Sequence, residues 1–369
     1  MEGRLWFANS YAEAAGRFLI ACDDLREAGH KVSNDRLEIG MAGPAGEPLC
    51  IDVAIVGSLE SGKVLLSSSG IHGVEGYPGS AIQLAVMDDL SKQDPFKDHA
   101  IIFVHTINPY GMAWFRRFNE NNVDLNRNFL RRDQEYTGTP DGYENVREFI
   151  NPKTTPKRKE RWFKLKAFRL IMKYGFNNLK QCIAEGQYEY PKAIQFGGKV
   201  LQPGPELLLN WLDEKLEDVS KIWAIDLHTG LGPNGHDTLL VSAGMSKEKY
   251  SHLEKLFPGH MESLDPNSGV GYEIVGDLHQ GLEDRYRKIE WVSITQEFGT
   301  FKPLQVLKAS RAENQWTQWG IYADQVDARR HWSREQMLRT FNPRDEIWQA
   351  KITSRGRMVF NTAREDLLS

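Results

Sequence analysis

The residues in this sequence best suited to catalysis are histidines and carboxylates that follow apolar, strand-like segments. His72 and Glu75 lie three residues apart in the glycine-rich segment GIHGVEG, residues 70–76. His228 lies far along the chain, in the segment DLHTG that ends another apolar run. Neutral imidazole and carboxylate are common ligands of zinc, and a short-spaced pair with one remote ligand is typical of catalytic zinc sites. These three residues are therefore the candidate metal ligands.

Two further segments carry groups that a hydrolytic site needs. Glu297 ends the apolar run WVSITQ, where a partly buried carboxylate suits a general base with a raised pKa. Residues 116–129, RRFNENNVDLNRNF, concentrate arginine, asparagine and aspartate. Arg127 in this segment is able to form a bidentate pair with a carboxylate.

The elements that must position these residues are predicted from apolar periodicity. Strands are expected at residues 49–56, 64–69, 101–107, 221–227, 238–242 and 291–296. Helices are expected at about 10–28, 80–90, 206–219, 246–256, 304–328 and 333–352, and glycines and prolines mark turns at 40–48. The strand–helix–strand order indicates a parallel sheet with crossover helices. Sites in such sheets lie at the carboxyl ends of strands, which is where His72 and His228 fall.

Composition excludes several classes of protein. The chain has 369 residues, of which 40% are hydrophobic, and a formal net charge of −4. Such a small net charge indicates neither a nucleic acid nor an anionic membrane as partner. No apolar run approaches the roughly 18 residues of a membrane helix, and the N-terminal segment lacks the apolar stretch of a signal peptide. The three scattered cysteines favour a reducing compartment, so a cytoplasmic location is expected.

Residues 130–200 interrupt the pattern and are predicted to be a helical insertion. Residues 153–173 contain nine basic residues and one acid, with Trp162, Leu165, Phe168 and Ile171 on one helical face. This stretch would suit an anionic partner or a membrane surface. The favoured interpretation is an insertion helix with a solvated basic face that packs through its aromatic residues. We expect one α/β domain over residues 1–369, with the insertion at about 130–200 and a mostly helical region at about 304–369.

The four segments, in this order, resemble the zinc carboxypeptidase family, the carboxypeptidase A-like metallopeptidases. The resemblance rests on GIHGVEGYPGSAIQ, NPYGMAWFRRFNENNVDLNRNF, DLHTG and TQEFGT, which also look like a bacterial branch described as a domain of unknown function. It implies a single mixed, mostly parallel twisted sheet with helices on both faces. It also implies one zinc ion held by His72, Glu75 and His228.

The resemblance implies roles for the remaining candidates. Asp124 matches the carboxylate that orients His72, and Glu297 matches the general base that deprotonates metal-bound water. Arg117 matches the residue that stabilises the oxyanion, with Arg116 as the alternative. Asn126 and Arg127 match the pair that grips a terminal carboxylate of the substrate.

A tyrosine that closes over substrate in digestive members of the family has two candidates here. Tyr272 is preferred over Tyr286, although neither lies in a convincing motif.

The resemblance implies a metallocarboxypeptidase that removes C-terminal residues from peptides. The alternative is a deacylase of N-acyl amino acids, because the succinylglutamate desuccinylase and aspartoacylase family is similar at the same positions. The helical pattern at residues 304–340 favours the peptidase, since the deacylase family ends in a β domain. Either substrate would carry a free carboxylate. A binding module that retains the fold without catalysis is a third hypothesis, and the oligomeric state is not predicted.

Overall fold

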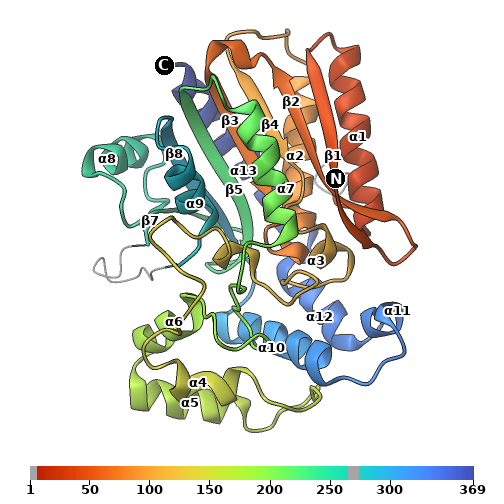
Figure 1. Cartoon of the computed structure of the whole chain (residues 1–369), viewed down its shortest axis with the longest axis vertical. Coiled ribbons are helices and arrows are strands. Elements are labelled where there is room, and N and C mark those ends of the chain that lie inside the picture. Colours follow the sequence, from red (N-terminus) through yellow and green to blue (C-terminus); the bar gives the residue numbers. More distant parts are fainter. Residues whose placement is uncertain (1–5, 265–273) are drawn as a thin grey trace.

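The computed structural model of the chain describes residues 6–264 and 274–369. Eight strands form one sheet (Figure 1). They are β1 (Val32–Ala42), β2 (Pro48–Gly57), β3 (Lys63–Ser69), β4 (Ala100–Val104), β5 (Lys221–Gly230), β6 (Asp237–Val241), β7 (Met261–Ser263) and β8 (Glu290–Gly299).

The α-helices among the described residues alternate with these strands and then follow them. They are α1 (Tyr11–Glu27), α2 (Gly76–Leu90), α3 (Pro109–Ala113), α4 (Tyr143–Ile150), α5 (Phe163–Tyr174), α6 (Phe176–Ala184), α7 (Pro203–Lys215), α8 (Lys247–Leu256), α9 (Leu278–Arg285), α10 (Pro303–Trp319), α11 (Gln325–Arg329), α12 (Trp332–Phe341) and α13 (Glu346–Leu368). Among the described residues, no helix is both long enough and apolar enough to cross a membrane.

The sheet is mixed, with a parallel centre. The strand order is β1-β2-β4-β3-β5-β8-β6-β7. The four central strands β4, β3, β5 and β8 run parallel, whereas β2 joins them antiparallel on one side and β6 on the other. The parallel centre places the carboxyl ends of β3, β5 and β8 side by side. This arrangement confirms the predicted mixed, mostly parallel sheet.

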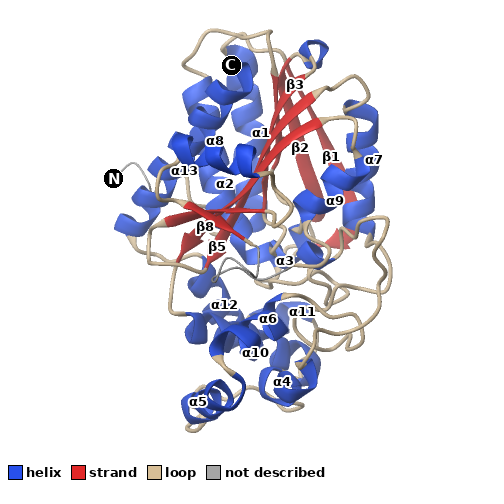
Figure 2. Ribbon diagram, turned by 90° about the vertical axis from the view of Figure 1, so that its left-hand side faces the viewer, coloured by secondary structure: helices blue, strands red, loops and turns tan. Residues whose placement is uncertain are grey.

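Helices cover both faces of the sheet, as predicted (Figure 2). Alternate residues of β4 point to opposite faces because side chains alternate along a strand. Ile101 and Phe103 join a core with α1, α2 and α13, whereas Ile102 and Val104 join a core with α7 and α9. Both sets are almost completely buried. Apolar burial on both faces explains why the central strands read as nearly continuous hydrophobic runs.

Helices α4, α5 and α6 form a layer below the carboxyl ends of the strands, next to α10 (Figures 1 and 2). Their apolar residues, with Phe118 and Ile194, form a separate core against Leu307 of α10. The region predicted as a helical insertion is therefore helical at its centre, and the C-terminal region is helical from α10 to α13.

Several expectations about local structure are wrong. The helix expected at 304–328 is two helices, α10 and α11, and the helix expected at 333–352 is also two, α12 and α13. β1 was not predicted: only turns were expected at residues 40–48, but its polar residues alternate on an edge strand, with Gly40 at an irregularity in the pairing with β2. The three-residue strand β7 was also missed. The aromatic residues expected to pack α5 onto the protein are exposed instead: Trp162 by 63% and Phe168 by 58%. The helix packs through Phe163 and Ala167.

Candidate active site

The predicted metal ligands come from the carboxyl ends of adjacent strands. His72 follows β3 and precedes a single 3-10 turn, Gly73–Glu75, that places Glu75 on the same side. His228 lies near the end of β5, and its direct partner on β8 is Glu297. Residues far apart in sequence therefore meet because parallel strands end at one edge of the sheet.

His72, Glu75 and His228 form a compact, buried cluster. One nitrogen or oxygen atom from each lies within 4.8 Å of the others. His228 Nδ1 is 3.5 Å from Glu75 Oε2, and the two imidazole rings are nearly perpendicular, with centroids 5.0 Å apart. The backbone N–H of Thr229 donates to Glu75 Oε2 at 2.9 Å and fixes the carboxylate. Two imidazoles and one carboxylate are a donor set that fits a catalytic divalent metal.

A carboxylate on the same strand orients His228. His228 Nε2 donates to Asp226 Oδ2 at 2.5 Å, which leaves Nδ1 facing Glu75. Ser68 of the neighbouring strand donates to the other oxygen of Asp226 at 2.7 Å. Histidines that bind metals usually donate their second ring N–H to such a partner. Asp226 therefore has the contacts of a positioning residue.

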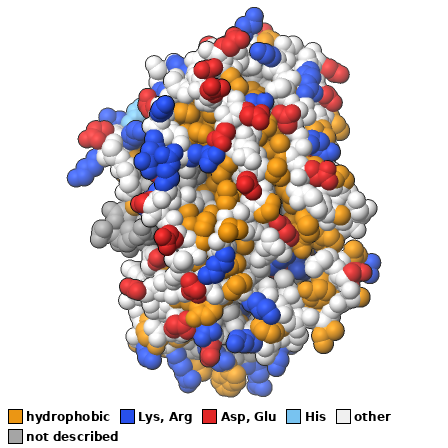
Figure 3. Space-filling view, viewed as in Figure 1, with side chains coloured by type: hydrophobic (Ala, Val, Ile, Leu, Met, Phe, Trp, Pro, Cys, Tyr) orange, Lys and Arg blue, Asp and Glu red, His pale blue; other side chains and the backbone are white. Residues whose placement is uncertain are grey.

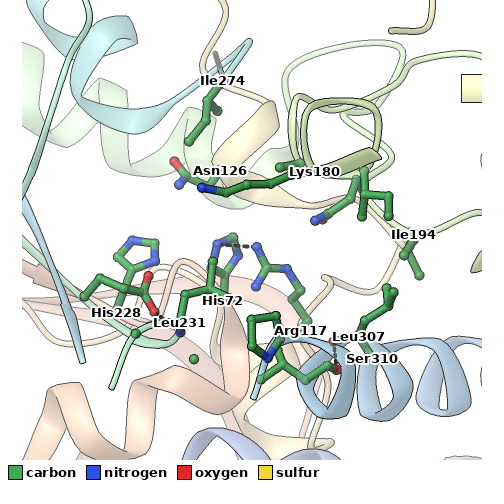
Figure 4. A pocket seen from close by; sticks show the side chains of 18 of the residues that line it. His72, Arg117, Asn126, Lys180, Ile194, His228, Leu231, Ile274, Leu307 and Ser310 are labelled. Carbon is green, nitrogen blue, oxygen red and sulfur yellow. Dashed lines mark hydrogen bonds between the residues drawn. The ribbon is translucent and has the colours of Figure 1, made fainter. Parts of the chain in front are cut away.

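Asp124 links the other histidine to an arginine. His72 Nδ1 lies 3.3 Å from Asp124 Oδ1, and Arg117 Nε donates to Asp124 Oδ2 at 3.1 Å. The guanidinium also donates to Glu75 Oε1 at 3.1 Å and to His72 Nε2 at 2.7 Å (Figure 4). Arg117 thus lies against the cluster, where it is placed to contact an oxygen that develops charge there.

Close backbone packing holds the turn that carries His72 and Glu75. A Cβ on Gly73 would lie 2.1 Å from the carbonyl carbon of Gly111, so neither backbone leaves room for a side chain. The N–H of Val74 donates to the carbonyl of Arg116 at 2.9 Å. The side chain of Asn108 caps α3 and donates to the carbonyl of Arg117. These contacts bring Arg117 beside the turn.

Burial and neighbouring charges shift the pKa values of the site. Burial, together with Arg117, lowers the pKa of His72 to about 3. Burial raises the pKa of Glu75 to about 8, although His228 and Arg117 lower it. Burial also raises the pKa of Glu297, against the effect of His228. For His228 burial acts downwards, but Asp226, Glu75 and Glu297 outweigh it and raise the pKa to about 9. A raised carboxylate pKa is expected of a general base.

The predicted carboxylate-binding pair lines the same cavity. Asn126 lies in the 3-10 turn Leu125–Arg127, and its Oδ1 accepts from the N–H of Leu278 at 3.0 Å. Arg127 Nε donates to the carbonyl of Ala184 at 3.0 Å, and its Nη1 donates to the carbonyl of Asn126 at 2.5 Å. Its guanidinium is therefore fixed by backbone carbonyls at the cavity wall.

Two of the remaining candidates, Arg116 and Tyr286, lie elsewhere. Arg116, the alternative to Arg117, points away from the cluster: its Nε donates to Glu313 at 2.9 Å in a buried ion pair. Tyr286 lies on the outer side of the sheet, where its hydroxyl donates to Asp213 at 2.8 Å. Tyr272, the preferred closing tyrosine, lies outside the described residues.

A cavity of about 470 Å³ connects the cluster of His72, Glu75 and His228 with Glu297, Arg117 and the pair Asn126 and Arg127. His72, Glu75, His228, Glu297 and Arg117 line one end, and apolar residues of α4, α5, α6 and α10 line the other. In Figure 4, His72 and His228 face each other at the lower side of the cavity, and Asn126 lies above them. Lys180 extends from α6 towards Asn126.

Sequence reasoning missed two residues of this site and half of its cavity. Asp226 was given no role, although the spacing Asp-x-His places it on the same strand face as His228 and was the available signal. Lys180 had no signal, because only the folded insertion brings α6 over the cluster. Burial, with a counteracting effect of Glu262, lowers the pKa of Lys180. The apolar half of the cavity depends on the same helix packing.

Several solved structures resemble this fold at low sequence identity. Carboxypeptidase A from Helicoverpa armigera is 12% identical, with 95% of this chain and 74% of that chain covered and a TM-score of 0.47. An aspartoacylase family protein from Mesorhizobium loti is 16% identical, with 79% and 68% covered and a TM-score of 0.37. Murein-tripeptide amidase from Escherichia coli O157 is 16% identical, with 79% and 94% covered and a TM-score of 0.37.

No curated protein matches the sequence. The predicted membership of a branch described as a domain of unknown function is confirmed by a match over residues 7–355: the chain belongs to the family described as "Protein of unknown function (DUF2817)".

Proposed function

We propose that this protein is a zinc-dependent hydrolase that cleaves an amide bond close to a free carboxylate, most simply as a metallocarboxypeptidase acting on peptides. One observation carries the proposal. The cluster of His72, Glu75 and His228 shares a cavity with a carboxylate of raised pKa, Glu297, and with the guanidinium of Arg117. These are the groups that hydrolysis by a metal-activated water requires.

The ligand set supports zinc as the metal, with His72, Glu75 and His228 as the residues that would hold it. Three protein ligands of this kind leave room for water or substrate at a catalytic zinc. When bound, zinc lowers the pKa of its water to about 7 and polarises a carbonyl oxygen.

The residues of the chain supply the proton transfer and the charge stabilisation. Glu297 is held by the N–H of Leu231, which donates to its Oε1 at 2.9 Å. Its raised pKa suits it to accept a proton from the attacking water and to deliver that proton to the leaving amine. Arg117, with its guanidinium against the cluster, is placed to stabilise the oxyanion that forms on the scissile carbonyl.

Three residues would bind the carboxylate of the substrate. Asn126, Arg127 and Lys180 line the cavity beside the cluster. The backbone contacts of Arg127 use only part of its donor set, because a guanidinium carries five N–H groups. Fixing a terminal carboxylate here would bring only the adjacent amide bond to the metal.

A deacylase of N-acyl amino acids is the second candidate, and the apolar half of the cavity favours it. Such a substrate has the same amide bond next to a carboxylate, but it carries an acyl group in place of a peptide chain. A large apolar chamber beyond Arg117 suits that group.

The experiment that tests both candidates is mass spectrometry of a mixed pool of short peptides and N-acyl amino acids, incubated with zinc-loaded protein. Glu297→Gln is the inactive control, and Glu290→Gln, an exposed glutamate at the start of the same strand, is the matched control. Loss of single C-terminal residues would support the peptidase. Cleavage of the acyl amino acids alone would establish the deacylase. No change in either class, with zinc bound, would refute the proposal.

A further inference from the structure

The cavity at the metal cluster has two chemically different ends. Polar and charged residues surround the cluster, whereas apolar residues of the insertion and of α10 line the far end. Arg117 and Phe118 mark the boundary: the first contacts the cluster and the second belongs to the core of the insertion. Representative residues of the apolar end are Phe149, Ala167, Leu170, Ile183, Ile194 and Leu307.

The apolar end is an unfilled chamber and not a closed core. Phe149, Leu170 and Ile183 pack against the core of the insertion but stay only partly buried, because one side of each faces the cavity. At its rim, Leu304 is 39% exposed and Phe176 is 54% exposed. Apolar surface that remains in contact with water costs free energy, and concave apolar pockets with a few polar groups at one end typically bind ligands.

The chamber offers a peptide chain few hydrogen-bonding side chains, Gln195 and Ser310 among them. Each peptide unit brings an N–H and a C=O that need partners when they leave water. The hydroxyl of Ser310, which lines the chamber, already donates to the carbonyl of Val306 at 3.2 Å. A hydrocarbon chain brings no such groups and gains free energy with each methylene that it buries.

We propose that the substrates are amino acids N-acylated with a long aliphatic chain. The chain would fill the chamber, and the carboxylate would lie towards Asn126 and Lys180. This inference rests on the proposed amide hydrolysis and specifies its substrate. Water adds to the amide carbonyl, the C–N bond breaks and the amine takes up a proton, so the products are a fatty carboxylate and a free amino acid.

The test compares N-dodecanoyl and N-acetyl derivatives of the same amino acids, with release of the amino acid measured for the zinc-loaded protein. We expect kcat/KM at least about tenfold higher for the dodecanoyl compounds. Ala167→Phe fills part of the chamber and is expected to remove most of this preference. Ala12→Phe, exposed on α1 and far from the chamber, is the matched control and should retain it. Leu304→Gln at the exposed rim should weaken the preference without threatening the fold.

The outcomes separate the inference from the function on which it rests. Equal rates for acetyl and dodecanoyl compounds would overturn the chain assignment and leave amide hydrolysis intact. Hydrolysis of neither, while peptides are still cleaved, would overturn the acyl-chain assignment and leave the metallocarboxypeptidase intact. Hydrolysis of neither, with peptides also left intact, would count against the proposed function. In that case, binding is tested by displacement of a fluorescent fatty acid with N-dodecanoyl glycine. Displacement from the original protein but not from Ala167→Phe would support the assignment of the chamber to an acyl chain. Failure to displace the fatty acid would overturn that assignment.

A second observation concerns the outer face of α5. Leu165, Phe168 and Met172 are spaced i, i+3 and i+7, and they are exposed by 38%, 58% and 71%. Trp162, just before the helix, extends this stripe. Exposed lysines and arginines border it, and α5 contains no acidic residue. They are Arg161, Lys164, Lys166, Arg169 and Lys173. Figure 3 shows apolar and basic side chains together along this lower end of the molecule.

We infer that this face of α5 docks onto an anionic lipid surface. The charge decides the partner, because residues 161–173 carry exposed lysines and arginines beside the apolar stripe and contain no acidic residue, a combination that matches the acyl boundary and the anionic headgroups of a membrane. The opposite face of α5 contributes Ala167 and Leu170 to the chamber. From the sequence we expected no membrane partner. That expectation relied on the small net charge and on burial of the aromatic residues of α5, but the aromatic residues are exposed.

The test is co-sedimentation of the full chain with phosphatidylcholine vesicles, prepared with and without phosphatidylglycerol. We expect binding only to the anionic vesicles, with loss at high salt. Phe168→Ser combined with Met172→Ser should abolish binding. Ile347→Ser combined with Met358→Ser removes two comparably exposed apolar residues from α13 and should not. Binding unaffected by the α5 substitutions, or a dimer that these substitutions dissociate, would overturn the assignment.

Discussion

Replacing Asp226 by asparagine tests how the cluster is held together. The Asp226 carboxylate accepts from His228 Nε2 at 2.5 Å and from Ser68 at 2.7 Å, and it is almost completely buried. Asp226→Asn preserves the volume and retains an acceptor oxygen, so the ring should keep its orientation. The negative charge is lost, and His228 becomes a weaker donor of electrons to a metal.

The expected loss of metal affinity follows from the position of Asp226, which contacts one candidate metal ligand, His228. Loss of such a partner typically lowers metal affinity about 10- to 100-fold, which corresponds to about 1.4–2.7 kcal/mol. The carboxylate is excluded from solvent, and the ring that it orients acts on it more strongly than His279 does, so we expect the upper half of this range. The stability of the metal-free protein should change less.

The assay is a competition titration of zinc against a chromogenic chelator at pH 7.5, with thermal unfolding measured in parallel. Asp52→Asn is the matched control: it removes another buried carboxylate of the sheet, one on β2 that pairs with Arg36 of β1. A zinc affinity of Asp226→Asn within about twofold of the original value, or an equal loss in the control, would refute the reasoning.

Three further outcomes concern stability and buried groups. Burial alone would raise the pKa of Glu313, but Arg116 and Arg334 hold this pKa below its usual value. The ionised Glu313 therefore stabilises the folded protein above about pH 4.5, and this stabilisation is lost as pH falls through the lowered pKa. Glu313→Gln should cost about 3–5 kcal/mol in urea unfolding at pH 7 and flatten the decline at acid pH; an unchanged acid decline would contradict this. Gly73→Ala should destabilise the protein by about 1–3 kcal/mol or more, whereas Gly16→Ala, with open space around it, should stabilise α1 by about 0.5–1 kcal/mol. The three buried cysteines should react with a thiol reagent only after unfolding.

The parts of the site that could be predicted are those that strand ends determine. His72, His228 and Glu297 each follow or end an apolar run, and parallel strands must finish at one edge, so their convergence follows from the pattern alone. The edge strand β1 was not predicted because its alternating residues are polar and only partly buried. Periodicity did find a helical face in α5, but it could not tell whether Phe168 pointed inward or into solvent.

The parts that could not be predicted depend on contacts between distant segments. The chamber needs α5 and α6 to pack against α10, more than a hundred residues later, and no local pattern reports that contact. Lys180 reaches the cluster only through the same packing. Ion pairs between residues far apart in sequence, such as Glu313 with Arg116, cannot be predicted for the same reason.

The insertion does not only cover the site but also makes hydrogen bonds to residues that belong to it. The N–H of Asp124 donates to the carbonyl of Phe196 at 2.7 Å, and the hydroxyl of Tyr188 donates to the carbonyl of Arg127 at 2.8 Å. The residue that orients His72 and the residue expected to grip substrate are thus both held by the segment that forms the chamber. We expect substrate choice to depend on how α4, α5 and α6 meet α10. Changes in the insertion should therefore alter substrate positioning together with chain preference.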